Sequence, residues 1–294
     1  MKTEQRIFFL NGSFVPEKDA VVSVLDRGML FGDGVYEISA VVNSRTIDNE
    51  SHLKRLERSL AMVNIPSPYA FEKWVQLQDE LIGLNHLDEG TVYIQVTRGV
   101  QQERSFLPSR NMSPTVIMLT QAKGVINNPG YGEGIAVVTE PEQRWARRDI
   151  KSNNLLAQVL ARQAASERGA QEAWLVEDGF VTEGAASSAF IVSTKGELVT
   201  RQLSQAILPG VTRGTLLQFA SDNNLELVQR PFTVAEAYAA REAFISSSNE
   251  IALAVVKIDD RIIGDGSPGP VTKALREAYV KAIVTRRPAL GEPR

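Results

Sequence analysis

The stretch Arg147-Arg148-Asp149-Ile150-Lys151-Ser152-Asn153-Asn154-Leu155-Leu156 sets a lysine just ahead of an apolar helical pattern. Further along the chain, Val181-Thr182-Glu183-Gly184 brings an acid to the end of a predicted hairpin strand. A lysine amine can bond covalently to an aldehyde, and a carboxylate can keep a proton on a ring nitrogen. Lys151 and Glu183 together therefore favour an enzyme over a purely structural protein.

Pyridoxal phosphate needs these two groups more than any others. Its aldehyde forms a Schiff base with a lysine, and an acid protonates its pyridine nitrogen so that the ring can accept electrons. Such a lysine must be neutral when it attacks, which requires a pKa below the ordinary lysine value of ~10.4. Desolvation and nearby cations lower a lysine pKa, and Arg144, Arg147 and Arg148 lie close to Lys151 in sequence.

Each residue also has a plainer interpretation. Most lysines are solvated surface charges, and Glu183 could be an ordinary turn residue. For the cofactor phosphate, Leu208-Pro209-Gly210-Val211-Thr212-Arg213 offers a helix start, Ser246-Ser247-Ser248-Asn249 offers hydroxyls, and Arg55 is the candidate arginine. A Pro-Gly-x-Thr entry can equally be simple helix capping, and Arg55 could be a solvated helix residue.

Composition excludes several other classes of protein. The chain has 294 residues, 43% of them hydrophobic, which is enough for a sizeable core in one large or two smaller domains. A net charge of −3 gives no overall basic field for nucleic acid. With no cysteine and only two histidines, no metal site is expected. The N-terminus does not resemble a signal peptide, and no apolar run could span a membrane, so a cytoplasmic protein is expected.

Hydrophobic periodicity predicts a first α+β unit, residues 1–120. The expected helices are Glu50–Val63 and Tyr69–Leu84. The expected strands are Arg6–Phe9, Ser13–Val15, Val35–Val42, Thr46–Ile47, Thr91–Thr97 and Thr115–Leu119. Residues 121–134, rich in glycine and asparagine, are the expected linker.

A larger second unit, residues 135–294, is expected to carry the candidate lysine. Its first helix is predicted over Asn153–Arg168, with Leu155, Leu156, Val159 and Leu160 facing inward. Two further helices are expected at Gly210–Asn223 and Val271–Thr285. Its expected strands are Ile135–Thr139, Glu172–Val176, Phe180–Thr182, Ala189–Val192, Glu197–Thr200, Ala243–Ser246 and Ala254–Ile258.

Six short motifs occur in one order along nearly the whole chain, from about Phe9 to Arg276. They are Asp26-Arg27-Gly28, Gly32-Asp33-Gly34-Val35-Tyr36-Glu37, His52-Leu53-Lys54-Arg55-Leu56, Asp149-Ile150-Lys151-Ser152, Thr182-Glu183-Gly184 and Leu208-Pro209-Gly210-Val211-Thr212-Arg213. In this order the chain resembles the fold-type IV pyridoxal phosphate enzymes, which include D-amino-acid, branched-chain and (R)-amine transaminases and aminodeoxychorismate lyase.

The resemblance implies an α+β two-domain fold and a role for each matching residue. Lys151 is implied to be the Schiff-base lysine and Glu183 the partner of the pyridine nitrogen. Tyr36 is implied to be an active-site tyrosine near the substrate. The phosphate would be held by Arg55, the amides of Val211 and Thr212, and Ser248. Members of the family are typically homodimers.

Val35-Tyr36-Glu37 is most similar to the pattern of D-amino-acid transaminases. This similarity implies amino transfer between a D-amino acid, such as D-alanine or D-glutamate, and a 2-oxo acid, such as pyruvate or 2-oxoglutarate. The family's Arg-x-His pair, which holds the substrate carboxylate, is absent from the loop Arg98–Phe106, where Glu103 and Ser105 take its place. Arg104 is the candidate substitute.

If Arg104 points away, (R)-amines without a carboxylate become the expected substrates. An (R)-selective amine transaminase is therefore the first alternative. A branched-chain aminotransferase, an aminodeoxychorismate lyase and a non-catalytic binding protein on the same scaffold are further alternatives.

Overall fold

The computed structural model describes residues 6–285. Within this range the chain has an α+β architecture and divides into two compact units. The first unit contains residues up to 125 together with the segments 143–159 and 204–208, and the second contains 126–142, 160–203 and the residues from 209 onward. The sequence predicts two units that are each continuous in the chain and are separated by residues 121–134. In the structure the segment that carries Lys151 belongs instead to the first unit.

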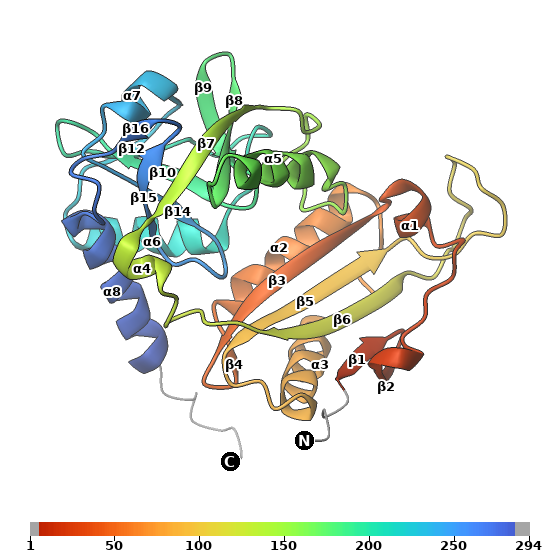
Figure 1. Ribbon diagram of the computed structural model, residues 1–294. Coiled ribbons are helices and arrows are strands. Elements are labelled where there is room, and N and C mark those ends of the chain that lie inside the picture. The colour runs from red at the N-terminus through yellow and green to blue at the C-terminus, as the bar shows by residue number, and fades with distance from the viewer. Residues whose placement is uncertain (1–5, 286–294) are drawn as a thin grey trace. The chain divides into compact units, whose positions relative to one another are not determined.

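The first unit is built on a six-stranded antiparallel sheet in the order β2-β1-β6-β5-β3-β4. Figure 1 shows β3, β5 and β6 as its long central strands. The tight turn between β1 and β2 places Asn11 and Gly12 at positive φ, as expected for an Asn-Gly hairpin. The strands are β1 (Ile7–Leu10), β2 (Ser13–Pro16), β3 (Gly34–Val42), β4 (Arg45–Thr46), β5 (Gly90–Thr97) and β6 (Thr115–Ala122).

Helices α2 (Asn49–Met62) and α3 (Phe71–Leu84) cover one face of this sheet (Figure 1). Leu53, Leu56 and Leu60 recur at helical spacing and are buried in the core beneath the sheet, as their periodicity predicts. A 3₁₀ turn, η1 (Glu17–Asp19), and a short helix, α1 (Arg27–Phe31), precede β3. The side chain of Asp26 caps α1 by accepting a hydrogen bond from the amide of Gly28 at 2.8 Å.

Alternation along β3 sends successive side chains to opposite faces of the sheet. Val35 and Val41 belong to the helix-covered core, so Glu37, in step with them, faces α2. Tyr36 therefore faces the other side, where its ring stacks on Tyr93 of β5 with centroids 5.7 Å apart.

The second unit contains a ten-stranded mixed sheet, with the order β12-β11-β10-β14-β15-β7-β8-β9-β13 and β16 paired to β15. Strand β7 runs parallel to both β8 and β15, and β11 is parallel to β12. The strands are β7 (Ile135–Pro141), β8 (Glu172–Glu177), β9 (Phe180–Gly184), β10 (Ser188–Val192), β11 (Leu198–Thr200), β12 (Leu227–Gln229), β13 (Phe232–Thr233), β14 (Glu242–Ser246), β15 (Leu253–Ile258) and β16 (Arg261–Ile262).

The remaining helices are α4 (Gly130–Glu133), α5 (Leu156–Glu167), α6 (Val211–Asp222), α7 (Val234–Tyr238) and α8 (Pro270–Thr285). Trp174, Phe232 and Val181 are fully buried in the main core of the second unit. Helix α4 lies within residues 121–134, and β6 extends to Ala122, so the expected linker is partly structured.

The predicted inward face of α5 is wrong. Leu156, Val159 and Leu160 are 71%, 57% and 50% exposed in the single chain. The buried side of the helix is formed instead by Ala161 and Ala165, which pack in a cluster of small residues. The prediction followed the large apolar side chains and overlooked the alanines, which can also fill a closely packed face.

Candidate active site

The segment around Lys151 is held by backbone hydrogen bonds to the start of β3. The Tyr36 amide donates to the Lys151 carbonyl at 2.9 Å, and the Asn153 amide donates to the Gly34 carbonyl at 3.1 Å. The Lys151 amide donates to the hydroxyl of Ser59 on α2 at 3.3 Å. A Cβ on Gly34 would lie 2.7 Å from both the Asn153 side chain and the Val96 carbonyl, so glycine permits this close approach.

The Lys151 amine lies over the ring of Tyr36, with Nζ 4.2 Å from the ring centroid. Tyr36 is backed by Tyr93, whose hydroxyl donates to Gln95 Oε1 at 2.7 Å. Burial raises the pKa of Tyr93 well above its ordinary value, and the neighbouring Tyr36 adds to the rise. The structure thus brings together two predicted site residues, Lys151 and Tyr36, on one face of the sheet.

Arg55 lies on the opposite, helix-covered side, where it is paired with Glu37. Its Nε donates to Glu37 Oε2 at 2.9 Å and its Nη2 donates to Oε1 at 2.6 Å. His52 Nδ1 lies 2.9 Å from the same Oε1. Arg55 is only 7% exposed, so the interpretation of Arg55 as a solvated helix residue is wrong. The two-pronged pair with Glu37 fixes the plane of the guanidinium.

Burial alone would raise the pKa of Glu37, which is fully enclosed. The charge and hydrogen bonds of Arg55, with a smaller contribution from His52, outweigh burial and hold this pKa far below its ordinary value. Glu37 is therefore an anion at neutral pH, and it anchors Arg55.

In the second unit, Glu183 is a buried residue of β9 rather than an exposed turn residue. Burial lowers the pKa of Arg213, and the nearby negative charge of Glu183 acts against that change. Arg213 is itself held by hydrogen bonds from Nη2 to the Arg201 carbonyl and to Gln229 Oε1, both at 2.9 Å. Glu183 is therefore a buried acid whose charge reaches the guanidinium of Arg213, a residue of α6.

Val211 and Thr212 are the first two residues of α6. Gly210, the N-cap, is extended, and no side chain caps the helix. A Cβ on Gly210 would lie 2.8 Å from the Ser188 hydroxyl and 3.1 Å from Arg213 Cβ, so this entry admits no larger residue without movement. The first amides of a helix have no intrahelical partner, so an uncapped helix start suits an anion such as phosphate.

The serines at the end of β14 and just after it differ in their hydrogen bonds. The hydroxyl of Ser247 donates to Glu250 Oε2 at 2.8 Å and accepts the amide of Glu250, which builds the turn. The hydroxyl of Ser246 is buried and has no hydrogen-bond partner among residues 6–285. Ser248, the predicted phosphate ligand, is partly exposed in this same turn.

Arg104 lies on a loop of the first unit, against aromatic rings. Its guanidinium carbon is 4.8 Å from the centroid of Phe31 and 5.6 Å from that of Phe106. The side chain is exposed. Within the described part of the chain, Arg104 makes no hydrogen bond to the predicted site residues.

Sequence reasoning missed several of the residues that support these side chains, namely Glu37, His52, Ser59, Tyr93 and Arg213. A two-residue alternation along β3 separates Glu37 from Tyr36, and this signal could have found the Arg55 partner. No sequence pattern indicates that the Ser59 hydroxyl meets the Lys151 amide, because 92 residues separate them.

Comparison with known proteins gives one consistent family. Residues 34–258 match the family model for amino-transferase class IV. The chain is 35% identical over 277 residues to a D-alanine aminotransferase of Staphylococcus aureus, covering 94% of this chain and 97% of the relative. It is 36% identical over 276 residues to a D-alanine aminotransferase of Listeria monocytogenes, covering 94% and 95%.

Solved structures give the same fold. A branched-chain aminotransferase of the archaeon Thermoproteus uzoniensis, solved with norvaline, matches with a TM-score of 0.82 at 27% identity, over 97% of this chain and 96% of that one. The Escherichia coli branched-chain aminotransferase matches with a TM-score of 0.84 at 23% identity, over 98% and 97%. The latter likeness concerns the fold alone.

The chain belongs to the class IV aminotransferases. It is therefore a pyridoxal-phosphate-dependent aminotransferase with the fold-type IV architecture. The residues present fit this cofactor. A lysine amine lies against an aromatic ring, Glu183 is a buried acid, the start of α6 has no side-chain cap, and the Ser246 hydroxyl lacks a protein partner within residues 6–285.

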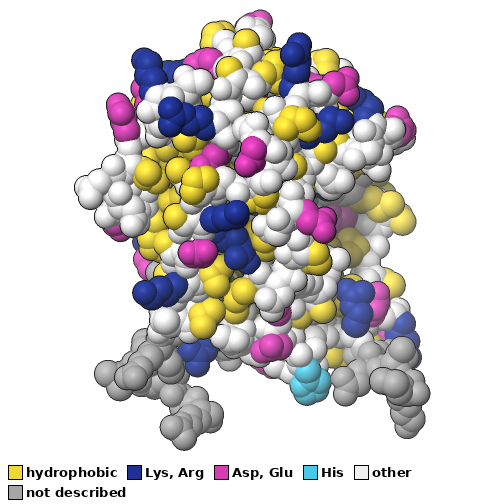
Figure 2. All heavy atoms as spheres, turned by 60° about the vertical axis from the view of Figure 1, so that its left-hand side comes forward, with side chains coloured by type: hydrophobic (Ala, Val, Ile, Leu, Met, Phe, Trp, Pro, Cys, Tyr) yellow, Lys and Arg dark blue, Asp and Glu magenta, His cyan; other side chains and the backbone are white. Residues whose placement is uncertain are grey.

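Residues 6–285 contain no helix long and apolar enough to cross a membrane. They also contain no group of three or more acidic, histidine or cysteine side chains arranged to hold a metal ion. On the face shown in Figure 2, basic and acidic side chains are interspersed rather than gathered by sign, in keeping with the small net charge.

Proposed function

We propose that this enzyme transfers an amino group between a D-amino acid, D-alanine or D-glutamate, and a 2-oxo acid, pyruvate or 2-oxoglutarate. The observation that carries the proposal is the near-full-length similarity to D-alanine aminotransferases. The Lys151 amine, which lies over the central residue of Val35-Tyr36-Glu37, supports it. The proposed place of action is the cytoplasm.

Lys151 is the proposed catalytic residue. When bound, pyridoxal phosphate withdraws electrons from the α-carbon of the amino donor. With the cofactor in place, Lys151 would take the proton from that carbon and deliver a proton at the C4′ atom of the cofactor. Its backbone is hydrogen-bonded to Tyr36 and Ser59, and its amine lies over the Tyr36 ring. Positioned proton transfer of this kind contributes about 10²–10⁴-fold to a rate.

Glu183 is the proposed partner of the pyridine nitrogen. A buried carboxylate that meets a protonated ring nitrogen makes a charge-assisted hydrogen bond. Arg213 lies near enough to favour the charged form of Glu183. An ionised Glu183 keeps the proton on the ring nitrogen, which maintains the electron demand that transamination needs.

The proposed phosphate ligands are Arg55, the amides of Val211 and Thr212, and Ser248. The start of α6 supplies backbone N–H groups and the positive end of a helix dipole. Arg55 supplies a full charge, and Glu37 sets its orientation. These groups bind and orient the cofactor and take no part in proton transfer.

Arg104 is the proposed ligand of the substrate carboxylate. It is exposed and, within residues 6–285, lies against aromatic faces, which stack on a guanidinium and leave its N–H edges available for an anion. An (R)-selective amine transaminase remains the second candidate function, because the loop lacks the family's Arg-x-His pair and carries Glu103 beside Arg104.

The proposed assembly is a homodimer. Several large apolar side chains are exposed in the single chain, among them Val21, Val24, Met29, Phe106, Leu107 and Leu156, each at least 68% exposed. Contiguous exposed apolar patches mark protein–protein interfaces, so these side chains are the proposed subunit contact. Sedimentation of the holoenzyme at micromolar concentration tests this, and a monomer there would contradict it.

A half-reaction screen tests the proposed function. The holoenzyme is mixed separately with D-alanine, L-leucine, (R)-1-phenylethylamine and its (S)-form, and the visible absorbance of the bound cofactor is followed. Rapid loss of this absorbance with D-alanine is the expected result.

Loss with L-leucine alone would favour a branched-chain enzyme, and loss with the (R)-amine alone would favour the amine transaminase. Pyruvate release from aminodeoxychorismate, with no response to the four amines, would indicate the lyase. A colourless protein that gains no visible band with added cofactor would favour the non-catalytic alternative.

A further inference from the structure

Arg27, at the first position of α1, is a buried arginine whose guanidinium reaches into a neighbouring loop. Its Nε donates to Asp33 Oδ2 at 2.7 Å. Its Nη1 donates to the Ser105 carbonyl at 2.5 Å, and its Nη2 donates to the Phe106 carbonyl at 3.0 Å. A side chain only 5% exposed thus joins a carboxylate to two successive carbonyls of the loop that carries Arg104.

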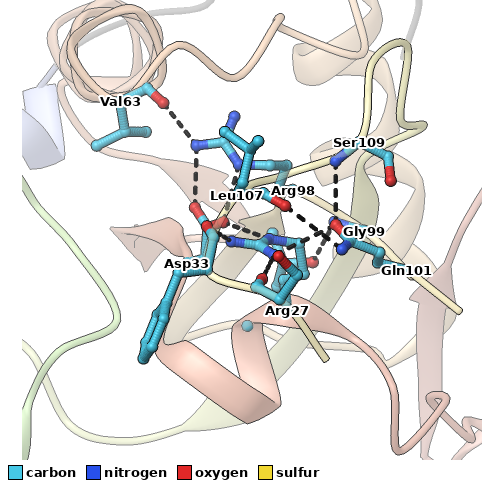
Figure 3. A network of polar contacts seen from close by, with 12 residues as sticks. Arg27, Asp33, Val63, Arg98, Gly99, Gln101, Leu107 and Ser109 are labelled. Carbon is cyan, nitrogen blue, oxygen red and sulfur yellow. Dashed lines mark hydrogen bonds and ion pairs between the residues drawn. The ribbon is translucent and has the colours of Figure 1, made fainter. Parts of the chain in front are cut away.

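Asp33 is held by a second arginine (Figure 3). Arg98 donates from Nε to Asp33 Oδ2 at 2.8 Å and from Nη2 to Oδ1 at 3.0 Å. Arg98 also donates to the carbonyls of Val63 at 2.7 Å and Asn64 at 2.8 Å. Burial would raise the pKa of Asp33, but the bonds and charges of Arg98 and Arg27 outweigh it and lower that pKa. Asp33 therefore remains an anion that holds both arginines.

Gln101 closes the loop upon itself (Figure 3). Its Nε2 donates to the carbonyls of Glu103 at 3.1 Å and Leu107 at 3.4 Å. Its Oε1 accepts the Ser109 amide at 3.0 Å and Arg27 Nη1 at 3.3 Å. Residues 101–109 contain no helix or strand, so these side chains take the place of a regular backbone ladder. The loop anchor consists of Arg27, Asp33, Arg98 and Gln101.

Arg104 itself has only weak attachments. It lies against Phe31 and Phe106, whose centroids are 5.3 Å apart, and Arg27 lies 4.8 Å from the centroid of the same Phe31 ring. An exposed cation–π contact is worth only about 0.5–1 kcal/mol, which is too little to order a loop. The position of Arg104 therefore depends on the backbone at Ser105 and Phe106, which Arg27 holds.

We propose that Arg27 is a positioning residue that fixes the 101–109 loop so that Arg104 can select substrates with a carboxylate. The inference rests on the proposed role of Arg104 in the function above. An arginine suits this place because its planar fork can reach one carboxylate and two carbonyls at once. A lysine could satisfy no more than part of this set, and an apolar side chain could satisfy none of it.

A double-mutant cycle tests the coupling. The kcat and KM of the holoenzyme are measured for D-alanine and for (R)-1-phenylethylamine in the parent, Arg27→Met, Arg104→Ala and the double variant. We expect each single change to raise the KM for D-alanine about tenfold while changing the KM for the amine much less. Because the effects of interacting sites are not additive, the double variant should be no worse than the poorer single variant. If the two increases in KM for D-alanine multiply in the double variant, Arg27 acts independently of Arg104, and this result would overturn the proposal.

Limited trypsin digestion of the holoenzyme provides a readout that needs no activity. The bonds after Arg104 and Arg110 lie within or beside the loop. Cleavage there should be several-fold faster in Arg27→Met than in the parent, because loops without anchoring contacts open more often. Arg168→Met is the matched control, since it removes an arginine with two ion pairs, to Glu140 and Asp259, elsewhere in the chain. It should digest like the parent.

Gln101→Ala is the second variant, because it releases the loop without touching the buried ion pair of Arg27 with Asp33. It should reproduce the faster cleavage and the selective rise in KM even if Arg27→Met folds poorly. Parental cleavage and parental KM in Gln101→Ala would overturn the proposal. If the parent does not turn over D-alanine, the proposed function fails, while faster cleavage in the variants would still show that the anchor orders the loop.

Discussion

Two residues, Lys151 and Glu183, carry the proposed chemistry, and each depends on contacts made by other residues. Both are common residue types, so only the order of the motifs around them indicated their roles in the sequence. The residues that support them could not be found in this way. Glu37 is adjacent to Tyr36 but faces the opposite side of the sheet, and Ser59 meets Lys151 only because α2 packs on β3. Contacts between distant segments have no local sequence signal.

Replacing Lys151 is the most direct test at this scale. Lys151→Ala should retain cofactor through the phosphate ligands but lose the covalent attachment, and turnover should fall by at least ~10²–10⁴-fold. Borohydride reduction followed by peptide mapping should find the cofactor mass on Lys151 in the parent only. Lys54→Ala is the control, because Lys54 is exposed and pairs only with Glu50 on the same helix. Near-parental turnover in Lys151→Ala would disprove the assignment.

Replacing Glu183 separates cofactor binding from electron demand. Glu183→Gln keeps the shape of the side chain and removes its charge, so we expect the cofactor to bind while kcat falls by about 10²-fold or more. The absorbance of the bound cofactor should also shift, because the ring nitrogen loses its proton. Glu167→Gln, on the exposed side of α5, is the control. Unchanged kcat and absorbance would assign the role to another acid.

At the scale of elements, long periodic segments were predicted best. Helices α2 and α3 and strands β3 and β5 lie within two residues of their expected bounds. The short helices α1, α4 and α7 were missed, because four or five residues are too few to show a periodicity. The inward face of α5 was wrong because alanines, rather than leucines, form its buried side.

Helix α8 depends on a contact that no local pattern indicates. Glu242 of β14 accepts the amides of Val271 at 2.9 Å and Thr272 at 2.8 Å, and also the Thr272 hydroxyl at 2.8 Å. An anion at a helix N-terminus is favourable. Glu242→Gln should therefore lower the free energy of unfolding by about 1–3 kcal/mol, because charged hydrogen bonds are lost from a buried site.

Gly269→Ala tests the same contact from the other side. A Cβ there would lie 2.1 Å from Glu242 Cδ, so the alanine variant should displace the carboxylate and destabilise the protein by a similar amount. Urea unfolding measures both changes. Gly132→Ala is the control, since a Cβ at that position meets nothing within 4 Å. If Gly269→Ala unfolds like the parent, Glu242 does not cap α8 in solution.

For the whole molecule, sequence predicted the fold class and family but not the division of the chain. The two expected units were each continuous in the chain, and Lys151 was assigned to the second of them. In the structure, residues 143–159 are grouped with the first unit, where Tyr36 and Gly34 pair with Lys151 and Asn153. A chain that returns to an earlier unit cannot be recognised from composition, because the returning segment has no distinctive residues of its own.

The buried pair of Glu37 with Arg55 should set the acid stability of the whole protein. The folded pKa of Glu37 is depressed, so its stabilising contribution is fully present above the ordinary glutamate value of ~4.3 and is lost as pH falls toward the folded value. At pH 7, Glu37→Gln should reduce the free energy of unfolding by about 3–5 kcal/mol, because the buried charge of Arg55 loses the carboxylate that faces it. That difference from the parent should narrow at pH 3.

Urea unfolding of the apoprotein at pH 7, 5 and 3 measures this effect without interference from cofactor release. Glu50→Gln, on the exposed face of the same helix as Arg55, is the matched control and should follow the parent at every pH, because exposed ion pairs contribute little. A gap between Glu37→Gln and parent that stays constant from pH 7 to pH 3 would show that folding does not lower the pKa of Glu37. Because Glu37 also orients Arg55, the same variant should bind pyridoxal phosphate more weakly at pH 7, which links the acid stability of the fold to the proposed phosphate site.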